Sequence, residues 1–170
     1  MTAPPSEAYC FFQSMLGIIK LTEFEGFLTG AEFVENNPET EQFCTDFKQQ
    51  SNPLLKAACE QLDEYFEGRR EIFNLALKPQ GTVFQRSAWE ALLRIPYGET
   101  RSYLQQAQSL NNPKAIRAVG QANSRNPIAI IIPCHRVIGK NGTLTGYAGG
   151  LDRKTQLLEL EQRFTHEQNN

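Results

Sequence analysis

The stretch Ile128-Ala129-Ile130-Ile131-Ile132-Pro133-Cys134-His135-Arg136-Val137 joins an apolar, mainly β-branched run to a cysteine and a histidine. The run predicts a buried strand that ends at Pro133. A cysteine is a strong nucleophile only as the thiolate, and a free thiol with a pKa of ~8.5 is mostly protonated at neutral pH. Such a cysteine needs a base or a positive neighbour, and one of the only two histidines in the chain follows Cys134 directly. We therefore predict a nucleophilic cysteine at the end of a strand.

Length and composition indicate an ordinary globular protein. The 170 residues are 40% hydrophobic and 21% charged, a balance that disordered and fibrous chains do not have. No apolar run approaches the ~20 residues that cross a bilayer, and the first residues lack the basic and apolar regions of a secretory signal. We therefore expect a cytoplasmic protein with no membrane partner. A reducing compartment suits a free thiol, and the cysteines have no spacing typical of a disulfide framework; they are Cys10, Cys44, Cys59 and Cys134.

Charge is distributed unevenly along the chain. Residues 1–80 carry 6 Lys or Arg and 13 Asp or Glu, whereas residues 81–170 carry 11 and 6, so the formal charges are −7 and +5. Between Arg101 and Lys154 there are 8 basic residues and 1 acidic residue. The basic segment indicates a localised anion-binding face, with nucleic acid as the leading ligand. A solvated basic surface without a ligand is the alternative that charge alone leaves open.

The first half of the chain predicts a small α/β unit. Three runs rich in apolar and aromatic residues indicate a strand meander, namely residues 10–13, 16–24 and 26–34. Asn52-Pro53 predicts a helix start, after which apolar residues recur at helical spacing. A further strand is expected over residues 71–77. The composition changes at the linker 78–81, which predicts domains at 1–78 and 79–170.

The second half predicts a helical unit that contains a helix-turn-helix. Ser102 is expected to cap a short helix that ends near Ser109, and a second helix is expected over residues 114–123. The turn Asn111-Asn112-Pro113 joins the two, and such a pair of short helices is typical of the helix-turn-helix motif. Further along, Asn141-Gly142 indicates a hairpin turn. Asp152 is expected to cap a final helix whose apolar face includes Leu157, Leu158 and Leu160.

The pentapeptide Pro133–Val137, the upstream Asn126-Pro127 and the downstream loop Gly146–Gly150 together resemble the O6-alkylguanine-DNA alkyltransferases, and most closely the bacterial type. Proteins of this family repair DNA by moving an alkyl group from guanine onto their own cysteine, once per molecule. The resemblance implies a small RNase H-like α/β domain with a supporting role, followed by a helical DNA-binding domain. It extends from about Thr82 to Glu161 and includes Trp89, Ile95-Pro96-Tyr97-Gly98, Ser102-Tyr103, Asn112-Pro113-Lys114, Arg117-Ala118-Val119-Gly120 and Leu157-Leu158.

The resemblance also implies the roles of the reacting residues. Cys134 is the nucleophile and the final acceptor of the alkyl group. His135 takes the thiol proton through a water molecule, because adjacent side chains on an extended chain point to opposite sides. Glu161 orients the imidazole, and Asn126 bonds near the thiolate and fixes the loop. Tyr103 rotates the phosphate and donates a proton toward N3 of the departing guanine.

The expected partner is double-stranded DNA that contains O6-alkylguanine, bound through its minor groove. Because O6 of guanine is hidden from a protein nucleophile in the duplex, the nucleotide must be flipped out of the stack, and Arg117 is expected to fill the gap. Further DNA contacts are expected from Lys114, Ala118, Arg125 and Tyr103. The base pocket is expected to include Asn123, Val137, Tyr147, Ala148 and Gly149. Ala148 stands where vertebrate members have serine, so only its backbone N–H could contact O6.

No cofactor and no metal are expected. Some family members hold a zinc ion in the N-terminal domain, but both histidines of this chain lie in the other half, and Cys10, Cys44 and Cys59 alone make a poor tetrahedral site. A monomer is expected in solution.

Two other function classes stay open at this stage. One is a lesion-binding module without transfer chemistry, against which the presence of Cys134 argues. The other is a thiol redox switch on a helix-turn-helix DNA binder, which would need a resolving cysteine nearby. The range of alkyl sizes and the acceptance of O4-alkylthymine depend on the shape of the pocket.

Overall fold

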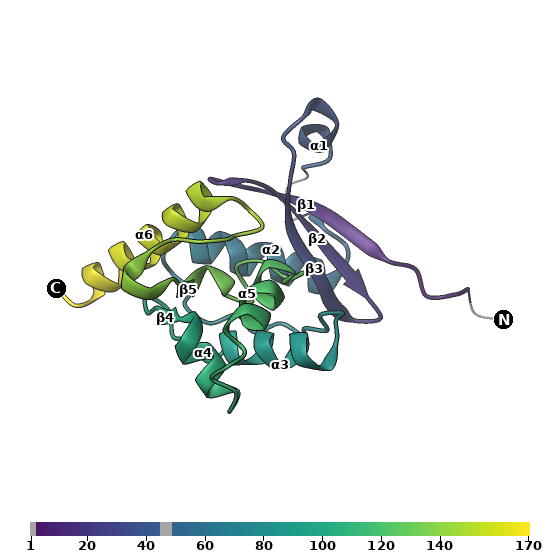
Figure 1. The fold of residues 1–170 in the computed structure, drawn as a ribbon. Coiled ribbons are helices and arrows are strands. Elements are labelled where there is room, and N and C mark those ends of the chain that lie inside the picture. The colour runs from purple at the N-terminus through teal and green to yellow at the C-terminus, as the bar shows by residue number, and fades with distance from the viewer. Residues whose placement is uncertain (1–2, 45–48) are drawn as a thin grey trace. The chain divides into compact units, whose positions relative to one another are not determined.

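The computed structural model describes residues 3–44 and 49–170. The chain divides into two compact units, Met1–Pro79 and Gln80–Asn170. The first unit combines a sheet with helices, and the second is mainly helical (Figure 1). None of the helices in the described part of the chain is both long and apolar enough to cross a bilayer.

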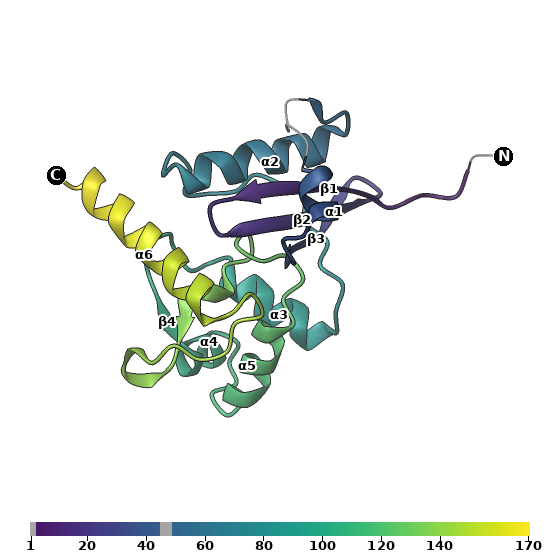
Figure 2. The same ribbon diagram turned by 90° about the horizontal axis from the view of Figure 1, so that it is seen from above.

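The first unit contains a three-stranded antiparallel sheet of β1 (Ala8–Ser14), β2 (Gly17–Phe24) and β3 (Phe27–Val34), in that order. The predicted meander is therefore confirmed. Figure 2 shows helix α2 (Pro53–Phe66) lying along this sheet. Asn52 caps α2 by accepting hydrogen bonds from two backbone N–H groups of its first turn, and Pro53 takes the first position, as the sequence predicts. In the sequence, the short helix α1 (Pro38–Gln42) follows β3 and precedes α2.

The core of this unit follows from the spacing of apolar residues, which is two in the strands and about 3.6 in the helix. Alternate residues of β1 and a helical stripe of α2 lose almost all exposure to water. Removing apolar surface from water contributes roughly 25 cal/mol per Å², so the amphipathic patterns of strand and helix together select this packing. The buried residues include Cys10, Phe12, Leu21, Leu28, Leu55, Ala58, Cys59, Leu62 and Tyr65.

The strand expected over residues 71–77 is wrong. Only a single bridge between Leu77 and Leu28 forms there. The backbone of Asn74 instead bonds with the Gln61 side chain, whose amide accepts from the Asn74 N–H at 2.8 Å and donates to the Asn74 carbonyl at 3.1 Å. The segment therefore meets β3 only at Leu28, which exchanges two backbone hydrogen bonds with Ala76 and Lys78, and a side chain of α2 bonds to the backbone of Asn74.

The second unit begins with α3 (Val83–Leu92) and the helix pair α4 (Tyr103–Ser109) and α5 (Ile116–Ser124). Ser102 caps α4 as predicted, through a capping box with Gln105. Helix α5 starts two residues later than expected, and its cap position, Ala115, offers no side-chain acceptor. The remaining elements are η2 (Cys134–Arg136), β5 (Val137–Ile138), η3 (Lys140–Gly142) and α6 (Leu151–Gln168), with β5 pairing in parallel with β4 (Arg101–Ser102).

Buried polar contacts hold these three helices together. The Trp89 indole N–H donates to the carbonyl of Ala122 at 2.8 Å, which joins α3 to α5. The Gln106 and Asn123 amides exchange two hydrogen bonds, of 2.9 and 2.7 Å, between α4 and α5. Each of these buried polar groups has a partner, so burial carries no desolvation penalty from unmade bonds.

The strand predicted over residues 128–132 is also wrong. The run folds into tight turns in which Ile132 N–H donates to the Ile128 carbonyl at 3.0 Å, and Ile130 has a φ of 70°. The four isoleucines are all buried. A buried apolar run looks the same in sequence whether it forms a strand or a turn, and in this one only Ile128 takes part in an isolated β-bridge.

Two local signals near the C-terminus gave different structures from those expected. Gly150, with a φ of 93°, occupies the cap position of α6 and Asp152 lies inside the first turn, where a carboxylate still interacts favourably with the helix dipole. Asn141-Gly142 forms a turn within η3, and the described residues that follow it do not form a second hairpin strand.

Candidate active site around Cys134

Cys134 opens the short helical turn η2 and is 6% exposed. The Asn126 side chain holds the segment in front of it: its amide nitrogen donates to the Ile132 carbonyl at 2.8 Å, and its oxygen accepts from the Ile128 N–H at 3.0 Å. The same nitrogen lies 3.3 Å from the Cys134 sulfur. Asn126 therefore shapes the turn and gives the sulfur a donor that favours its ionised form.

Burial raises the pKa of the Cys134 thiol, and the donor from Asn126 and the positive charge of Lys154 oppose this effect. The backbone N–H groups of Cys134 and His135 act in the same direction as Asn126. Because the effect of burial is the largest, the pKa of Cys134 is raised overall, and the resting sulfur is a thiol. The site therefore needs a base that can take its proton when the reaction begins.

The imidazole of His135 is fully buried, and its Nε2 lies 2.7 Å from the Glu161 carboxylate. Burial lowers the pKa of His135 although Glu161 acts against it, so the ring is neutral at neutral pH. An ionised carboxylate can only accept a hydrogen bond, and Nε2 must therefore carry the proton. Nδ1 is then the basic atom, and it is buried without a hydrogen-bond partner in the described part of the chain.

Glu161 stays ionised because of its neighbours. Burial by itself raises its pKa, but contacts with His135 and Arg136 outweigh burial and lower the pKa to about 2. A neutral imidazole contributes a hydrogen bond and no charge, so the permanent charge that holds Glu161 ionised is the Arg136 guanidinium. The Gly98 N–H adds a bond to the carboxylate at 3.2 Å. Gly98 has a φ of 76°, and a Cβ there would collide with the Thr165 hydroxyl.

Arg136 was given no role from the sequence, where it counted only as part of the pentapeptide Pro133–Val137 and of the basic segment. Its Nε and Nη2 each lie 2.9 Å from a carboxylate oxygen of Glu161, and its Nη1 donates to the Ile95 carbonyl at 2.7 Å. This two-pronged contact suits the planar guanidinium fork and fixes the carboxylate in orientation. Arg136 is thus a buried support of the His135–Glu161 pair.

Lys154 is the second residue that the sequence reasoning missed. Only 1% of it is exposed, and its Nζ donates to the carbonyls of Val137 at 2.6 Å and Thr145 at 3.0 Å. It ties α6 both to β5 and to the loop that leads to Tyr147. Lys154 lies three and seven residues before Leu157 and Glu161 on the buried face of α6, and this spacing was the signal that could have marked it as internal.

Lys154→Met is expected to lower the free energy of unfolding by about 2 kcal/mol, because two buried carbonyls lose a charged donor. Methionine keeps most of the side-chain volume. Loss of the positive charge is also expected to raise the pKa of the Cys134 thiol further. Urea unfolding measures the first effect, and the pH dependence of alkylation by iodoacetamide measures the second. Lys140→Met, at an exposed position, is the matched control. An unchanged unfolding free energy for the Lys154 variant would show that its hydrogen bonds to the two carbonyls do not stabilise the fold.

The residues expected to form the base pocket differ in their burial and in their hydrogen-bond partners. Burial is the main cause that raises the pKa of the Tyr147 hydroxyl, and nearby Cys134, when it is ionised, acts in the same direction. The Tyr147 hydroxyl is buried without a hydrogen-bond partner in the described residues. Val137 is buried in β5, Ala148 is exposed and Gly149 is half-buried. The amide of Asn123 is taken by Gln106 between α4 and α5.

The residues expected to contact DNA lie on or beside the helix pair. Arg117 and Ala118 are exposed on α5, and Lys114 and Arg125 are exposed just before and after it. Tyr103, at the start of α4, is half-buried and donates from its hydroxyl to the Thr145 carbonyl at 3.0 Å. Arg136 and Lys154 are buried, so the basic segment of the sequence is only partly a surface feature.

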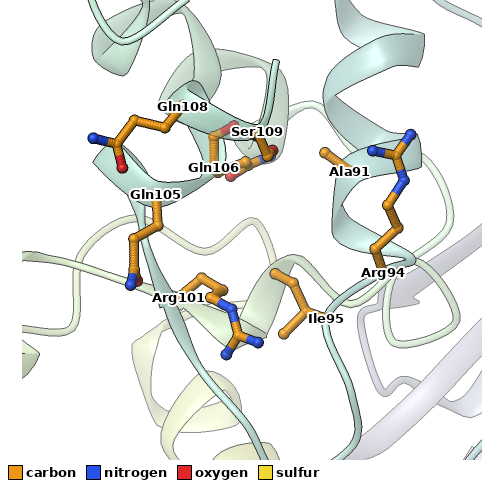
Figure 3. A pocket seen from close by; sticks show the side chains of 8 residues that line it. All are labelled: Ala91, Arg94, Ile95, Arg101, Gln105, Gln106, Gln108 and Ser109. Carbon is orange, nitrogen blue, oxygen red and sulfur yellow. Dashed lines mark hydrogen bonds between the residues drawn. The ribbon is translucent and has the colours of Figure 1, made fainter. Parts of the chain in front are cut away.

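A separate hollow of about 380 Å³ lies between α3 and α4 (Figure 3). It is lined by Ala91, Arg94, Ile95, Arg101, Gln105, Gln106, Gln108 and Ser109. None of these residues was given a role in transfer or in DNA binding, although Arg101 begins the basic segment of the sequence. Within residues 3–44 and 49–170, no group of three or more His, Cys, Asp or Glu side chains is placed to hold a metal ion.

Comparison with known proteins places this geometry in a family. Residues 83–163 match the model of the 6-O-methylguanine DNA methyltransferase DNA binding domain, and residues 8–79 match that of its ribonuclease-like domain. Methylated-DNA–protein-cysteine methyltransferase from Methanosarcina acetivorans is 50% identical over 90% of this chain and 97% of its own length. The corresponding protein of Mycolicibacterium paratuberculosis is 47% identical over 92% of this chain and 93% of its own.

Solved structures agree with this placement. The crystal structure of Mycobacterium tuberculosis O6-methylguanine methyltransferase superposes with a TM-score of 0.79 at 44% identity, covering 93% of this chain and 94% of that one. A crystal structure of the M. tuberculosis protein in complex with DNA has a TM-score of 0.79 at 45% identity and covers 92% and 93%.

The two matched models define a DNA-repair methyltransferase with a ribonuclease-like N-terminal domain and a helical DNA-binding domain, as expected. Cys134, His135 and Glu161 lie buried in the second of these domains. The chain belongs to the O6-methylguanine DNA methyltransferase family. Its activity is the transfer of a methyl group from methylated DNA to a protein cysteine, which repairs O6-methylguanine.

Proposed function

We propose that Cys134 is the cysteine that accepts the alkyl group, with His135 as the base that takes its proton. The observation that carries this assignment is the buried Nδ1 atom of His135, which has no protein partner in the described chain although Nε2 is held by Glu161. A water molecule between Nδ1 and the sulfur would complete the path of the proton. The oriented imidazole and the amide of Asn126 then favour the thiolate at the moment of attack.

The reaction is a displacement at carbon. The Cys134 sulfur forms a bond to the alkyl carbon, the bond from that carbon to O6 breaks, and its electron pair stays on guanine. A proton delivered to N3 neutralises the leaving base, and Tyr103 is the proposed donor. The Tyr103 hydroxyl bonds to the Thr145 carbonyl in the free protein, so it must exchange that partner for the substrate when DNA binds.

The proposed DNA interface is the exposed face of α5 and the residues on either side of it. The helix would enter the minor groove, with Arg117 in the space left by a flipped nucleotide and Lys114, Ala118, Arg125 and Tyr103 along the backbone. Exposed cations at these positions provide salt-dependent affinity without sequence preference. In this proposal residues 79–170 carry both DNA binding and transfer, and residues 1–78 support them.

A monomer acting in the cytoplasm is the form that fits this chemistry. The proposed reacting groups Tyr103, Asn126, Cys134, His135 and Glu161 all belong to one unit of one chain, so no second copy is needed to complete the site. A reducing compartment keeps the acceptor thiol free.

The test is intact-mass analysis after incubation with a duplex that contains one O6-methylguanine. The expected result is a single gain of about 14 Da, carried by the peptide of Cys134, with no gain from the unmethylated duplex. A gain located on another cysteine would overturn the assignment of Cys134. Duplexes with longer alkyl groups or with O4-methylthymine extend the same measurement to the substrate range.

Arg117→Ala is expected to slow repair of O6-methylguanine in duplex DNA by at least about tenfold, because the flipped state loses its filler and a cationic contact. The reaction with free O6-benzylguanine should change by less than about twofold, since a free base needs no flipping. Single-turnover rates on both substrates provide the measurement. Arg163→Ala, at an exposed position of α6, is the control, and equal losses on both substrates would count against the role of Arg117.

A further inference from the structure

The N-terminal unit contains a second pair of reactive groups that the repair reaction does not use. Cys10 on β1 and Cys59 on α2 lie with their sulfur atoms 3.7 Å apart. Both residues are buried, with 7% and 2% exposure. The two cysteines are 49 residues apart in the sequence, so their contact exists only because the helix packs on the sheet.

The two thiols are not equivalent. Either sulfur can donate in their 3.7 Å contact, and the additional side-chain hydrogen bond between Gln50 and Cys10 favours Cys59 as the donor. These donors lower the pKa of Cys10 against the effect of burial, whereas the bond with Cys10 and burial raise that of Cys59. Cys10 is therefore the more nucleophilic sulfur, and Cys59 is a protonated thiol beside it.

We propose that Cys10 and Cys59 form an oxidation site at which a hydroperoxide produces an internal disulfide. The Cys10 thiolate attacks one peroxide oxygen, the O–O bond breaks, and Cys10 becomes a sulfenic acid while the other oxygen leaves as water or alcohol. The Cys59 sulfur then attacks the sulfenic sulfur and expels hydroxide, which takes the thiol proton as water. The two thiols lose two electrons in total, and the peroxide gains them.

The geometry requires only a small movement. A disulfide bond is ~2.05 Å long, so the sulfur atoms must approach each other by about 1.7 Å. The bond would link β1 to α2. Because the two cysteines are 49 residues apart, it would close a long segment of the chain and restrict the unfolded state. Cys44 is the other cysteine of this unit, and its bridge with Phe11 places it beside β1. It is half-buried, which makes it a matched control for simple accessibility.

The experiment treats the folded full-length chain carrying Cys134→Ser with hydrogen peroxide and then maps its peptides without reduction. The expected product has lost about 2 Da and contains a linked pair of Cys10 and Cys59 peptides. Its thermal unfolding midpoint should rise, and dithiothreitol should reverse both changes. The same linkage is expected in the chain with all four natural cysteines, so the result does not depend on how well a variant folds.

Two further variants separate this pathway from general oxidation. With Cys59→Ser, Cys10 should stop at the sulfenic acid and be trapped by dimedone, whereas Cys44→Ser should leave the linkage intact. A disulfide through Cys44, or conversion of Cys10 to higher oxides while Cys59 is present and unlinked, would overturn the proposal. The methyl-transfer assay does not report on this linkage, so failure here and failure of the proposed function are distinguishable.

Discussion

Replacing Cys134 with serine is expected to abolish methyl transfer, so that no mass gain follows incubation with O6-methylguanine DNA. A hydroxyl is a far weaker nucleophile than a thiolate near neutral pH, and His135 cannot supply enough basicity to offset the difference. Serine is close in size to cysteine and can accept the hydrogen bond from Asn126 that the sulfur receives at 3.3 Å. The fold should therefore persist, and the loss should lie in the chemical step.

DNA binding separates this result from a general defect. The Cys134→Ser variant is expected to bind a duplex containing O6-methylguanine with an affinity within about twofold of the unchanged chain, because phosphate contacts by Lys and Arg dominate that affinity. Cys44→Ser, in the N-terminal unit, is the matched substitution and should retain the full mass gain. A Cys134→Ser chain that still acquires a methyl group on another residue would remove Cys134 from the mechanism.

Glu161→Gln is expected to reduce both stability and the rate of transfer. Removal of the carboxylate leaves the buried Arg136 guanidinium without its counter-charge, which costs about 3–5 kcal/mol in such pairs. The amide also no longer forces the proton of His135 onto Nε2, and the imidazolium that forms when His135 takes the thiol proton loses its counter-charge. Together these effects should lower the rate by roughly 100-fold. Urea unfolding and single-turnover kinetics measure the two effects. Glu159→Gln, exposed on the same helix, should change neither.

The same pair predicts how stability depends on pH. The pKa of Glu161 is lowered from its ordinary value of 4.5 to about 2 in the folded chain. Its contribution, on the order of 3 kcal/mol, is therefore present above pH 4.5 and is lost as the pH falls toward 2. Burial lowers the pKa of His135, so the unfolded chain also binds a proton more readily there, and stability falls as the pH drops below about 6.5.

Unfolding free energies between pH 7 and pH 3 test this expectation. The unchanged chain should lose stability progressively on acidification, and Glu161→Gln should lose less between pH 4.5 and pH 3, because its amide does not titrate. A variant that follows the same pH curve as the unchanged chain would show that Glu161 does not contribute through its charge.

Several local signals in the sequence were sufficient where a residue acts on its own neighbours, although the expected Asp152 cap and the Asn141-Gly142 hairpin did not form. Asn52-Pro53 and Ser102 start helices because a side-chain oxygen and a preset φ act within one turn, and the structure has both caps. The pentapeptide Pro133–Val137 carried the family assignment for a similar reason, since its reacting groups are adjacent in the chain. The strand meander followed from alternation and turn residues.

Other features depended on partners far away in the chain. The run at 128–132 is apolar enough to be buried in either conformation, and hydrogen bonds within the run fold it into turns. Arg136 and Lys154 counted only as charges of the basic segment, because the sequence does not show that Glu161 and the carbonyls of Val137 and Thr145 receive them inside the protein. For Lys154, only its spacing to Leu157 and Glu161 on α6 indicated an internal position. The amide of Asn123, which was expected in the base pocket, likewise hydrogen-bonds to Gln106 of α4.

The sequence by itself determined the element types at capped positions, the two-part organisation and the placement of a cysteine beside a histidine. Tertiary structure alone decided which charges are buried, which nitrogen of His135 is left basic, and that Cys10 meets Cys59. The physical reason is range: caps and turns are settled within a few residues, whereas desolvation and pairing of a charged or thiol group depend on whatever chain segment packs against it.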